Sequence, residues 1–318
     1  MALVSIDDVR AAAESIKGRA VRTPLLPLGD ELWLKPENLQ PVGAFKLRGA
    51  THALTRVPDE TRRAGVITHS SGNHGQALAY AGRLLGIPVV VVMPDTAPQV
   101  KIEATRRFGA EVVLVPAADR ESRTRTLADQ RGLRIVPPYD HPDIIAGQGT
   151  VGLEIVADLP DVAVVLVPVG GGGLASGVAT VVKALAPGVA VIGVEPALAA
   201  DAADSLAAGE LRPWTTRERY RTVADGLRTS LSELTFAHLR ARLDRIVTVT
   251  DEEILDTVPL LARSARIVAE PSGAVAVAAY LHRRPELPAG RTVAVVTGGN
   301  IDPALLARLL TPRTASAH

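Results

Sequence analysis

The amino-acid sequence predicts an α/β protein built on two open, mainly parallel sheets. Short β-branched runs alternate with alanine-rich segments of helical length, and such alternation is typical of right-handed βαβ units. The strand runs, for example residues 87–94, are apolar without interruption. Continuous apolar strands are expected where helices cover both faces of a parallel sheet. A chain of 318 residues is also long enough for two lobes.

The first series of alternating elements covers residues 65–132. In order, the sequence predicts a strand at 65–68, a helix at 72–86, a strand at 87–94, a helix at 97–109, a strand at 110–116 and a helix at 121–132. Gly86, Gly109 and Gly132 each follow a helical stretch, where a glycine in the left-handed conformation commonly ends a helix.

A second series of the same kind runs from residue 151 to residue 196. It contains a helical stretch at 151–160, a strand and glycine-rich turn at 162–173, a helix at 174–188 and a strand at 189–196. The proline pair at 137–138 separates the two series, which favours two lobes over one continuous sheet.

Composition excludes several classes of protein. Lys plus Arg (35) and Asp plus Glu (34) nearly balance, and no long run of one sign occurs, so nothing indicates a nucleic-acid or membrane-surface footprint. The absence of cysteine excludes disulfides, thiolate nucleophiles and cysteine metal sites. The N-terminal segment has no apolar core typical of a signal peptide, and the apolar runs are too short to span a membrane. We therefore expect a cytoplasmic location.

Lys46 is the first candidate for chemistry. It lies among Val42, Gly43, Ala44, Phe45 and Leu47, in the stretch KPENLQPVGAFKLRGA. A partly desolvated lysine amine is a nucleophile that forms a Schiff base with an aldehyde. Most lysines in such a setting are surface residues, so a catalytic role for Lys46 is supported only by the motifs elsewhere in the chain.

Four successive glycines, Gly170 to Gly173, stand between a strand and a helix. Their backbone can approach a ligand closely, and the free N–H groups at the start of the following helix favour a phosphate. The pattern Gly170-x-Gly172-x-x-Ala175, with Glu195 at the end of the next strand, also matches the relaxed dinucleotide fingerprint. A nicotinamide-dependent dehydrogenase is therefore an alternative, although it leaves the stretch THSSGNHGQALAY unexplained.

Taken together, five stretches resemble fold-type II pyridoxal-phosphate (PLP) enzymes, specifically the serine/threonine dehydratase and serine racemase group. They are KPENLQPVGAFKLRGA, THSSGNHGQALAY, VPVGGGGLASG, EPALAADAADS and VVTGGNID, and the resemblance runs from about residue 5 to residue 310. It implies two open twisted-sheet α/β domains with the cofactor in the cleft between them. Residues 1–60 and 142–318 would form the large PLP-binding domain, residues 61–141 the small domain, and the protein a homodimer.

The resemblance also implies the residues of the cofactor site. Lys46 would carry pyridoxal 5′-phosphate, Asn73 would face its 3′-oxygen, and Thr297 would face the pyridine nitrogen. A hydroxyl cannot protonate that nitrogen as a carboxylate would, which favours prompt loss of a β-substituent over a long-lived carbanion. The complete cofactor-binding set is Phe45, Lys46, Asn73, Gly170, Gly171, Gly172, Gly173, Leu174 and Thr297.

The asparagine loop would bind the substrate carboxylate. By resemblance its residues are Ser70, Ser71, Gly72, Asn73 and His74. The loop follows a strand and opens a helix, so its free N–H groups and partial positive charge suit a carboxylate. An ordinary helix N-cap would use the same residue types, which is the structural alternative for this motif.

The resemblance also implies a cation site, at the end of the predicted strand at residues 189–196. In EPALAADAADS, Glu195 and Asp201 would supply carboxylates and Ala199 a backbone carbonyl. Oxygen ligands of this kind suit Mg²⁺ or Ca²⁺ in a structural role. Glu270, in IVAEPSGA, matches a further family motif and is expected to support the cofactor or the cleft.

These residues predict an ammonia-lyase that converts a β-hydroxy amino acid of the L-threonine or L-serine type to a 2-oxo acid and ammonia, with Lys46 removing the α-proton. Serine racemase is the alternative. Racemisation needs a second acid, and Ser71 stands where serine racemases carry it, whereas Tyr139 stands where dehydratases tend to carry an aromatic residue. A non-catalytic α/β binding protein would require Lys46 to be incidental. The expected partner is a small amino acid, with no nucleic acid and no membrane.

Overall fold

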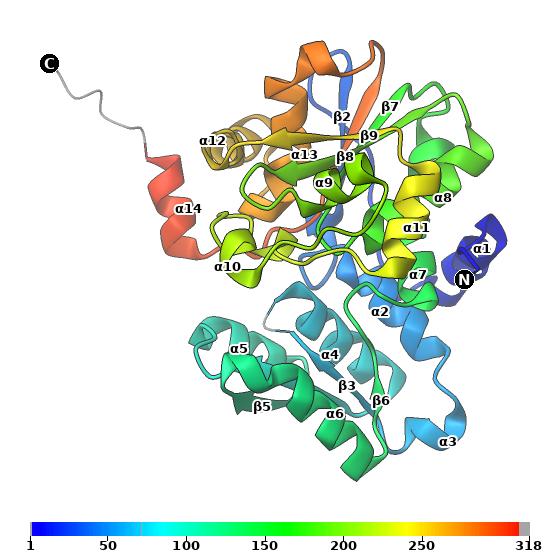
Figure 1. The fold of residues 1–318 in the computed structure, drawn as a ribbon, viewed down its shortest axis with the longest axis vertical. Coiled ribbons are helices and arrows are strands. Elements are labelled where there is room, and N and C mark those ends of the chain that lie inside the picture. Colours follow the sequence, from blue (N-terminus) through cyan, green and yellow to red (C-terminus); the bar gives the residue numbers. More distant parts are fainter. Residues whose placement is uncertain (1, 71, 312–318) are drawn as a thin grey trace, which may run out of the picture.

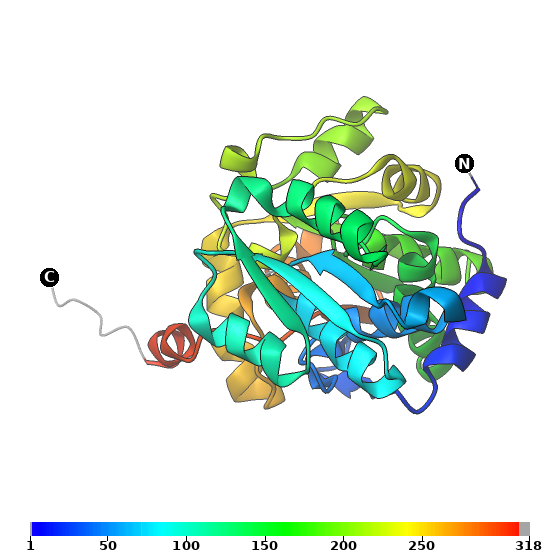
Figure 2. The same ribbon diagram turned by 90° about the horizontal axis from the view of Figure 1, so that it is seen from below.

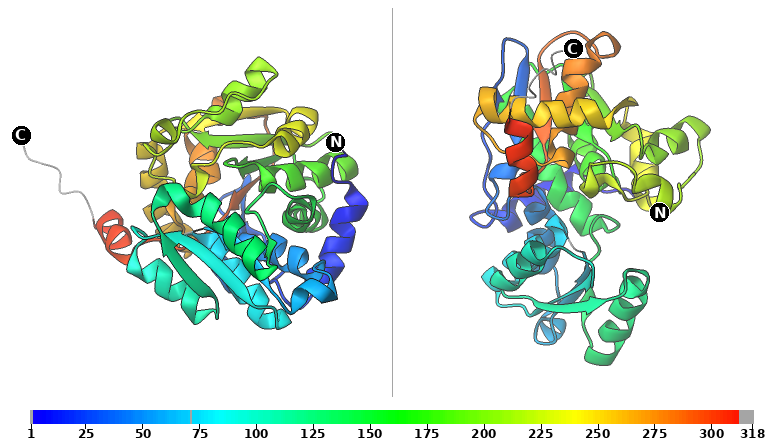
Figure 3. Two further views of the ribbon diagram at one scale, coloured as in Figure 1. Left: turned by 60° about the horizontal axis from the view of Figure 1, so that its bottom comes forward. Right: turned by 90° about the vertical axis from the view of Figure 1, so that its left-hand side faces the viewer.

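The computed structural model describes residues 2–70 and 72–311, which form two lobes, each built on its own open sheet (Figure 1). A six-stranded sheet occupies the upper lobe in Figure 1, and a four-stranded sheet occupies the lower lobe, drawn in cyan and green. The side view in the right panel of Figure 3 shows the same separation, and Figure 2 views the molecule from below, with the four-stranded sheet toward the viewer. The predicted α/β class with two open sheets is confirmed.

The six-stranded sheet has the strand order β1-β2-β10-β7-β8-β9. Its strands are β1 (Leu26–Pro27), β2 (Leu32–Pro36), β7 (Val164–Pro168), β8 (Ala190–Pro196), β9 (Arg245–Val249) and β10 (Thr292–Val296). All neighbours pair in parallel except β1 with β2. In the central register, Val165 pairs with Val191 and Val293.

Helices cover both faces of this sheet, which explains its continuous apolar strands. Val164 and Leu166 of β7 pack into one core cluster with α13 (Pro271–His282) and α12 (Asp251–Leu260). Val165 and Val167 face the opposite way, into a cluster with α7 (Pro142–Asp158), α8 (Gly173–Leu185) and α11 (Glu233–Arg242). Because side chains alternate along a strand, each face of β7 needs its own apolar partner layer.

The four-stranded sheet has the order β5-β4-β3-β6, and every pair in it is parallel. Its strands are β3 (Val66–His69), β4 (Val89–Pro94), β5 (Glu111–Val115) and β6 (Arg134–Ile135). Val91 of β4 packs toward α2 (Lys46–Thr55) and α4 (Asn73–Leu85), while Val90 and Val92 pack toward α6 (Arg120–Arg131). We call the part of the chain from β3 to β6, residues 66–135, the small lobe.

Shorter elements complete the fold. They are α1 (Ile6–Ile16), η1 (Glu37–Leu39), α3 (Asp59–Arg62), α5 (Gln99–Arg107), η2 (Ala117–Asp119), α9 (Asp201–Ala208), α10 (Thr216–Arg219), η3 (Asp225–Leu227), η4 (Leu261–Ala265), η5 (Arg284–Glu286) and α14 (Pro303–Leu310). The predicted left-handed glycines are confirmed, with φ of 65° at Gly86, 97° at Gly109 and 64° at Gly132. The domain boundaries at residues 60–61 and 141–142 stay a prediction.

No helix within the described ranges has the length and apolar character needed to cross a membrane.

Candidate active site

Lys46 is the first residue of α2, between the two lobes. Its Nζ donates a hydrogen bond to the backbone carbonyl of Pro138 at 2.8 Å and lies 4.9 Å from the centre of the Phe45 ring. Burial lowers the pKa of Lys46 to about 8, because the charged ammonium is poorly solvated there. A minor fraction of the amine is therefore uncharged near neutral pH, and this fraction is available as a base or nucleophile.

The backbone around Lys46 is tied to the end of β10. The N–H of Phe45 donates to the carbonyl of Thr297 at 3.0 Å, and Ala44 forms an isolated β-bridge with Gly298. The hydroxyl of Thr297 donates to the carbonyl of Ser272 at 3.2 Å. The structure thus brings Lys46 and Thr297 together, although 250 residues separate them in the chain.

The glycine loop lies between β7 and α8, as predicted. Gly172 has a φ of 84°, which favours glycine, and the first amides of α8 have no acceptor within the helix. A Cβ on Gly171 would lie 2.4 Å from the ring of Tyr139, and a Cβ on Gly170 would lie 3.0 Å from Cα of Leu227. Only glycine lets the backbone of this loop stay open to an anion while packed between these neighbours.

The asparagine loop connects β3 to α4. Gly72 is the N-cap residue of α4, and its N–H donates to Oγ of Ser70 at 3.3 Å. Ser71 lies outside the described residues, so its predicted role stays a prediction.

Asn73 is held by two side chains of the other lobe. Its Nδ2 donates to Oε1 of Glu270 at 2.6 Å, and its Oδ1 accepts from Nδ2 of Asn300 at 2.7 Å. Asn300 also donates to the carbonyl of Val42 at 2.9 Å, which fixes the orientation of its own amide. These two hydrogen bonds fix the orientation of the Asn73 amide, and its second N–H is left to face a ligand oxygen.

Glu270 and Asn73 approach each other over a glycine. A Cβ on Gly298 would lie 2.3 Å from Oε1 of Glu270 and 3.1 Å from Nδ2 of Asn73. Burial, together with the nearby Asp225 carboxylate, raises the pKa of Glu270 to about 7. The first glycine of the TGGN stretch is therefore explained by this close packing.

His74 is neutral at any working pH. Its Nε2 donates to the carbonyl of Val136 at 3.1 Å, whereas its buried Nδ1 has no hydrogen-bond partner among the described residues. Burial and the neighbouring Lys46 lower the pKa of His74 to about 3. Its predicted contact with substrate stays a prediction.

The predicted cation loop places Glu195 at the end of β8, beside the start of α9. Its carboxylate accepts from the backbone N–H groups of Ala202 at 3.1 Å and Ala203 at 2.8 Å. Burial and the neighbouring Asp201 carboxylate raise the pKa of Glu195. Within residues 2–70 and 72–311, no group of three or more His, Cys, Asp or Glu side chains is arranged to hold a metal. The predicted set has two carboxylates and one carbonyl, and it stays a prediction.

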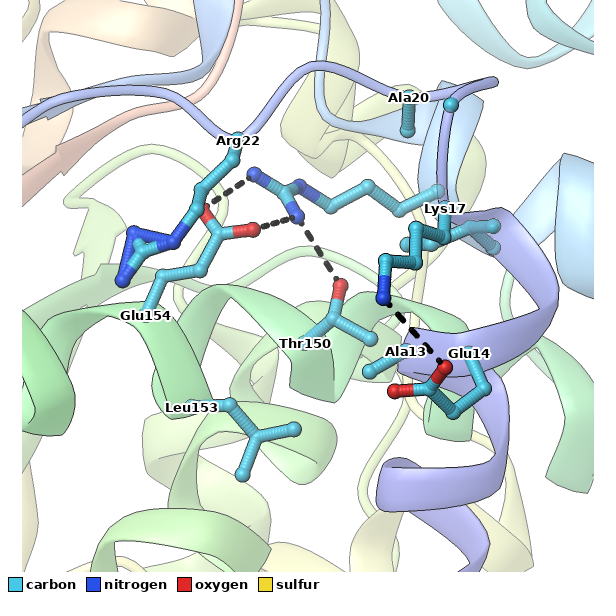
Figure 4. Close-up of a pocket in the computed structure, with 11 residues that line it drawn as sticks. Ala13, Glu14, Lys17, Ala20, Arg22, Thr150, Leu153 and Glu154 are labelled. Carbon is cyan, nitrogen blue, oxygen red and sulfur yellow. Dashed lines mark hydrogen bonds and ion pairs between the residues drawn. The ribbon is translucent and has the colours of Figure 1, made fainter.

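A separate cavity of about 260 Å³ lies between α1, α2 and α7 (Figure 4). Arg48 and Glu154, on its wall, are paired with each other at 2.6 Å. The lining residues include none of the predicted site residues, and we assign this cavity no part in the chemistry.

Sequence reasoning missed three contributors to the site. These are the carbonyl of Pro138, the amide of Asn300 and the carboxylate of Asp225. Asn300 belongs to the TGGN stretch and could have been proposed from it, whereas the other two carry no signal in the sequence.

The residues present fit pyridoxal 5′-phosphate. A partly buried lysine amine, a glycine loop that a single Cβ would obstruct, an oriented asparagine N–H and a threonine hydroxyl converge from separate segments. Each of these groups matches one part of that cofactor. The geometry alone favours this ligand over a dinucleotide, which would not need Lys46.

Comparison with known proteins agrees with this geometry. The chain is 39% identical over 312 residues to the L-threo-3-hydroxyaspartate ammonia-lyase of Saccharomyces cerevisiae, covering 95% of each protein. It is 38% identical over 312 residues to the serine racemase of Schizosaccharomyces pombe, covering 95% of this chain and 96% of that one. The solved structure of the T.th. threonine deaminase superposes with a TM-score of 0.88 at 43% identity, covering 94% of this chain and 99% of that chain.

Residues 16–298 match the family model described as "Pyridoxal-phosphate dependent enzyme". This match contradicts the alternative that the chain is a nicotinamide-dependent dehydrogenase. The chain is therefore a PLP-dependent enzyme and belongs to the family that contains these ammonia-lyases and racemases.

Proposed function

We propose that this enzyme is an ammonia-lyase that converts a β-hydroxy amino acid of the L-threonine or L-serine type to a 2-oxo acid and ammonia. The observation that carries the proposal is the Lys46 amine, which is partly buried, has a pKa of about 8 and donates a hydrogen bond to the carbonyl of Pro138. Relatives that are named ammonia-lyase or threonine deaminase support the same reaction class.

Pyridoxal phosphate, when bound, withdraws electrons from the α-carbon of the amino acid and makes the α-proton acidic. Lys46 takes up that proton, because its amine is partly uncharged near neutral pH. The backbone N–H groups of the glycine loop hold the phosphate, and Asn73 presents its free N–H to the cofactor oxygen. The β-hydroxyl leaves with a proton as water. Hydrolysis of the released elimination product then takes up one water and gives the 2-oxo acid and ammonia. The overall reaction therefore balances as amino acid to 2-oxo acid plus ammonia.

The asparagine loop holds the substrate carboxylate in this proposal. Gly72 and Asn73 begin α4, where backbone N–H groups are free and the helix dipole favours a negative charge. His74 stays neutral, so it contributes no competing charge to the site.

Racemisation is the second candidate activity, supported by the similarity to serine racemases. We assign to Ser71 the role of the second acid that returns a proton to the opposite face. Ser71→Ala should then suppress formation of the D-enantiomer more strongly than formation of the 2-oxo acid. Equal loss of both products would contradict this role.

The test of the proposed function is a panel of L- and D-serine, L- and D-threonine and both threo-3-hydroxyaspartates, with 2-oxo acid and enantiomer measured together. We expect 2-oxo acid from at least one L-hydroxy amino acid as the main product. Enantiomer formation that exceeds 2-oxo acid on every substrate would make the enzyme a racemase, and no turnover on any substrate would contradict both assignments.

We further propose that Glu195, Asp201 and the carbonyl of Ala199 bind Mg²⁺ or Ca²⁺. A divalent cation would offset the repulsion between the two neighbouring carboxylates. The expected result is a lower melting temperature in EDTA that added Mg²⁺ or Ca²⁺ restores in the wild type but not in Asp201→Asn. A homodimer and a cytoplasmic location remain predictions from the sequence.

A further inference from the structure

Lys101 and Asp225 form an ion pair between the two lobes. Nζ of Lys101, on α5 of the small lobe, lies 2.9 Å from Oδ2 of Asp225, on η3. Both side chains are partly exposed, with 28% of Lys101 and 42% of Asp225 accessible. We call these two residues the latch pair.

The latch pair is distinct among the ion pairs of the described residues, because it alone joins the small lobe to the rest of the chain. Other pairs, such as Arg131 with Glu111 or Lys183 with Asp244, stay within one lobe. Among the described residues, the side-chain hydrogen bonds that join the small lobe to the six-stranded lobe are, besides this pair, those of Asn73 with Glu270 and Asn300. Polar side-chain contact between the lobes is therefore concentrated at Asn73 and at the latch pair.

Asp225 also connects to elements around the candidate active site. Its Oδ1 accepts a hydrogen bond from Oγ of Ser272 at 3.4 Å, and that Oγ accepts one from the N–H of Gly226 at 2.9 Å. The carbonyl of Ser272 accepts the hydroxyl hydrogen bond of Thr297. Asp225 thus joins α5 of the small lobe to the start of α13.

The segment that begins at Asp225 also covers the glycine loop. A Cβ on Gly170 would lie 3.0 Å from Cα of Leu227 and 3.4 Å from the carbonyl oxygen of Gly226. A displacement of Asp225 by the small lobe would therefore move the backbone segment that packs directly against the glycine loop.

We propose that the latch pair holds the small lobe closed over the active site and thereby positions Asn73 against Glu270 and Asn300. Lys101 and Asp225 are positioning residues and take no part in the chemistry. The assignment of Asn73 to the cofactor rests on the proposed function, whereas the closure itself does not.

The strength of the pair suits a closure that must reverse in each cycle. A partly exposed ion pair is weak, so it biases an open–closed equilibrium by roughly 1.4- to fivefold and does not lock it. Such a pair is also weakened by salt, because at about 1 M ionic strength the screening length falls to about 3 Å.

The first test measures opening without substrate. Hydrogen exchange is followed in α4 and α5 of the protein loaded with pyridoxal phosphate and of the cofactor-free protein, for the wild type and Lys101→Gln. We expect roughly 1.4- to fivefold faster exchange in the variant, reproduced in the wild type by about 1 M NaCl and not increased further by salt in the variant. Unchanged exchange would overturn the proposal.

The matched control is Lys183→Gln. Lys183 pairs with Asp244 at 2.7 Å, and 23% and 44% of their side chains are accessible. This pair therefore resembles the latch pair in distance and exposure, but both of its residues belong to the six-stranded lobe. Exchange in α4 and α5 should not change in this variant. An equal effect of both variants would show that loss of any such ion pair loosens the fold, which would contradict a latch.

The second test uses charge reversal. Lys101→Glu and Asp225→Lys should each raise KM for the amino-acid substrate and lower kcat/KM several-fold, and the double variant Lys101→Glu/Asp225→Lys should recover most of the loss. A merely structural defect would not be rescued by the swap, and failure of the swap would overturn the proposal. If hydrogen exchange in α4 and α5 changes as expected but no hydroxy amino acid is turned over, the proposed function is wrong and the role of the latch pair is still supported.

Discussion

Lys46 and Glu270 are two ionisable side chains of the site whose pKa values burial brings close to neutrality. Burial lowers the pKa of Lys46 to about 8 and raises the pKa of Glu270 to about 7, so both groups lose charge relative to their ordinary state. The site therefore offers an amine that is ready to accept a proton and a carboxyl group that holds or releases one near neutral pH.

Glu270 gives the folded protein a specific dependence on pH. Its pKa is about 7 in the folded state and 4.5 ordinarily, so the folded state keeps a proton that the unfolded state loses between these values. The stabilisation is complete below pH 4.5 and is lost as pH rises through about 7. At about 1.4 kcal/mol for each unit, the change is on the order of 3 kcal/mol.

Glu270→Gln removes this titration. In denaturant unfolding of the cofactor-free protein, the free energy of unfolding of the wild type minus that of the variant should fall by on the order of 3 kcal/mol between about pH 4.5 and about pH 7.5. A difference that is the same at both pH values would show that Glu270 keeps an ordinary pKa in the fold.

At the scale of the elements, loops and helix starts from both lobes meet at one place. The glycine loop before α8, the asparagine loop before α4 and the TGGN turn after β10 each begin at the carboxyl end of a parallel strand. Ligands of open α/β sheets bind at these strand ends, because the connecting loops and free helix N-termini gather there. Close packing then requires glycine at the points of contact.

Gly171 tests the packing of the glycine loop. Gly171→Ala should lower the free energy of unfolding by about 1–3 kcal/mol and weaken binding of pyridoxal phosphate, because its Cβ would lie 2.4 Å from the Tyr139 ring. The control is Gly188→Ala, since a Cβ at Gly188 meets no atom within 4 Å. Equal effects of both substitutions, in unfolding and in cofactor titration, would contradict the tight loop.

A buried ionic cluster holds α2, the helix that begins with Lys46. Arg48 donates to Glu37 at 2.7 Å and to Glu154 at 2.6 Å, and Glu37 is fully buried. Burial alone would raise the pKa of Glu37, yet the Arg48 guanidinium keeps that pKa below its ordinary value. The carboxylate of Glu37 therefore depends on Arg48 for its charge to be tolerated.

Arg48→Met should lower the free energy of unfolding by about 3–5 kcal/mol, because it leaves the buried Glu37 carboxylate without its paired cation, whereas Glu154 keeps Lys35. Arg22→Met is the control, since the pair of Arg22 with Asp158 is partly exposed and should contribute less than about 1 kcal/mol. Denaturant unfolding of both variants checks the difference. A loss at Arg48 no larger than that at Arg22 would mean that the cluster does not stabilise α2.

Across the whole molecule, the features that the sequence predicts are those that depend on neighbouring residues. The two sheets follow from continuous apolar runs, and the glycine loop follows from local backbone chemistry between a strand and a helix. Lys46, Asn73 and Thr297 could be named because each stands in a short motif.

The features that the sequence does not predict depend on contacts between distant segments. Asn73 and Glu270 are 197 residues apart, and Lys101 and Asp225 are 124 apart, so no periodicity or local propensity indicates that they meet. The preference between elimination and racemisation depends on how pocket side chains surround the substrate, and neither the motifs nor the fold fixes that.

The central claim is that Lys46 carries pyridoxal phosphate. The most direct measurement is borohydride reduction of the purified, cofactor-loaded protein, followed by digestion and mass spectrometry, with Lys46→Ala in parallel. We predict loss of the yellow colour, a pyridoxyl phosphate adduct on Lys46 in the wild type, and neither adduct nor turnover in the variant. An adduct on another lysine, or a Lys46→Ala protein that keeps its colour and full turnover, would contradict the claim.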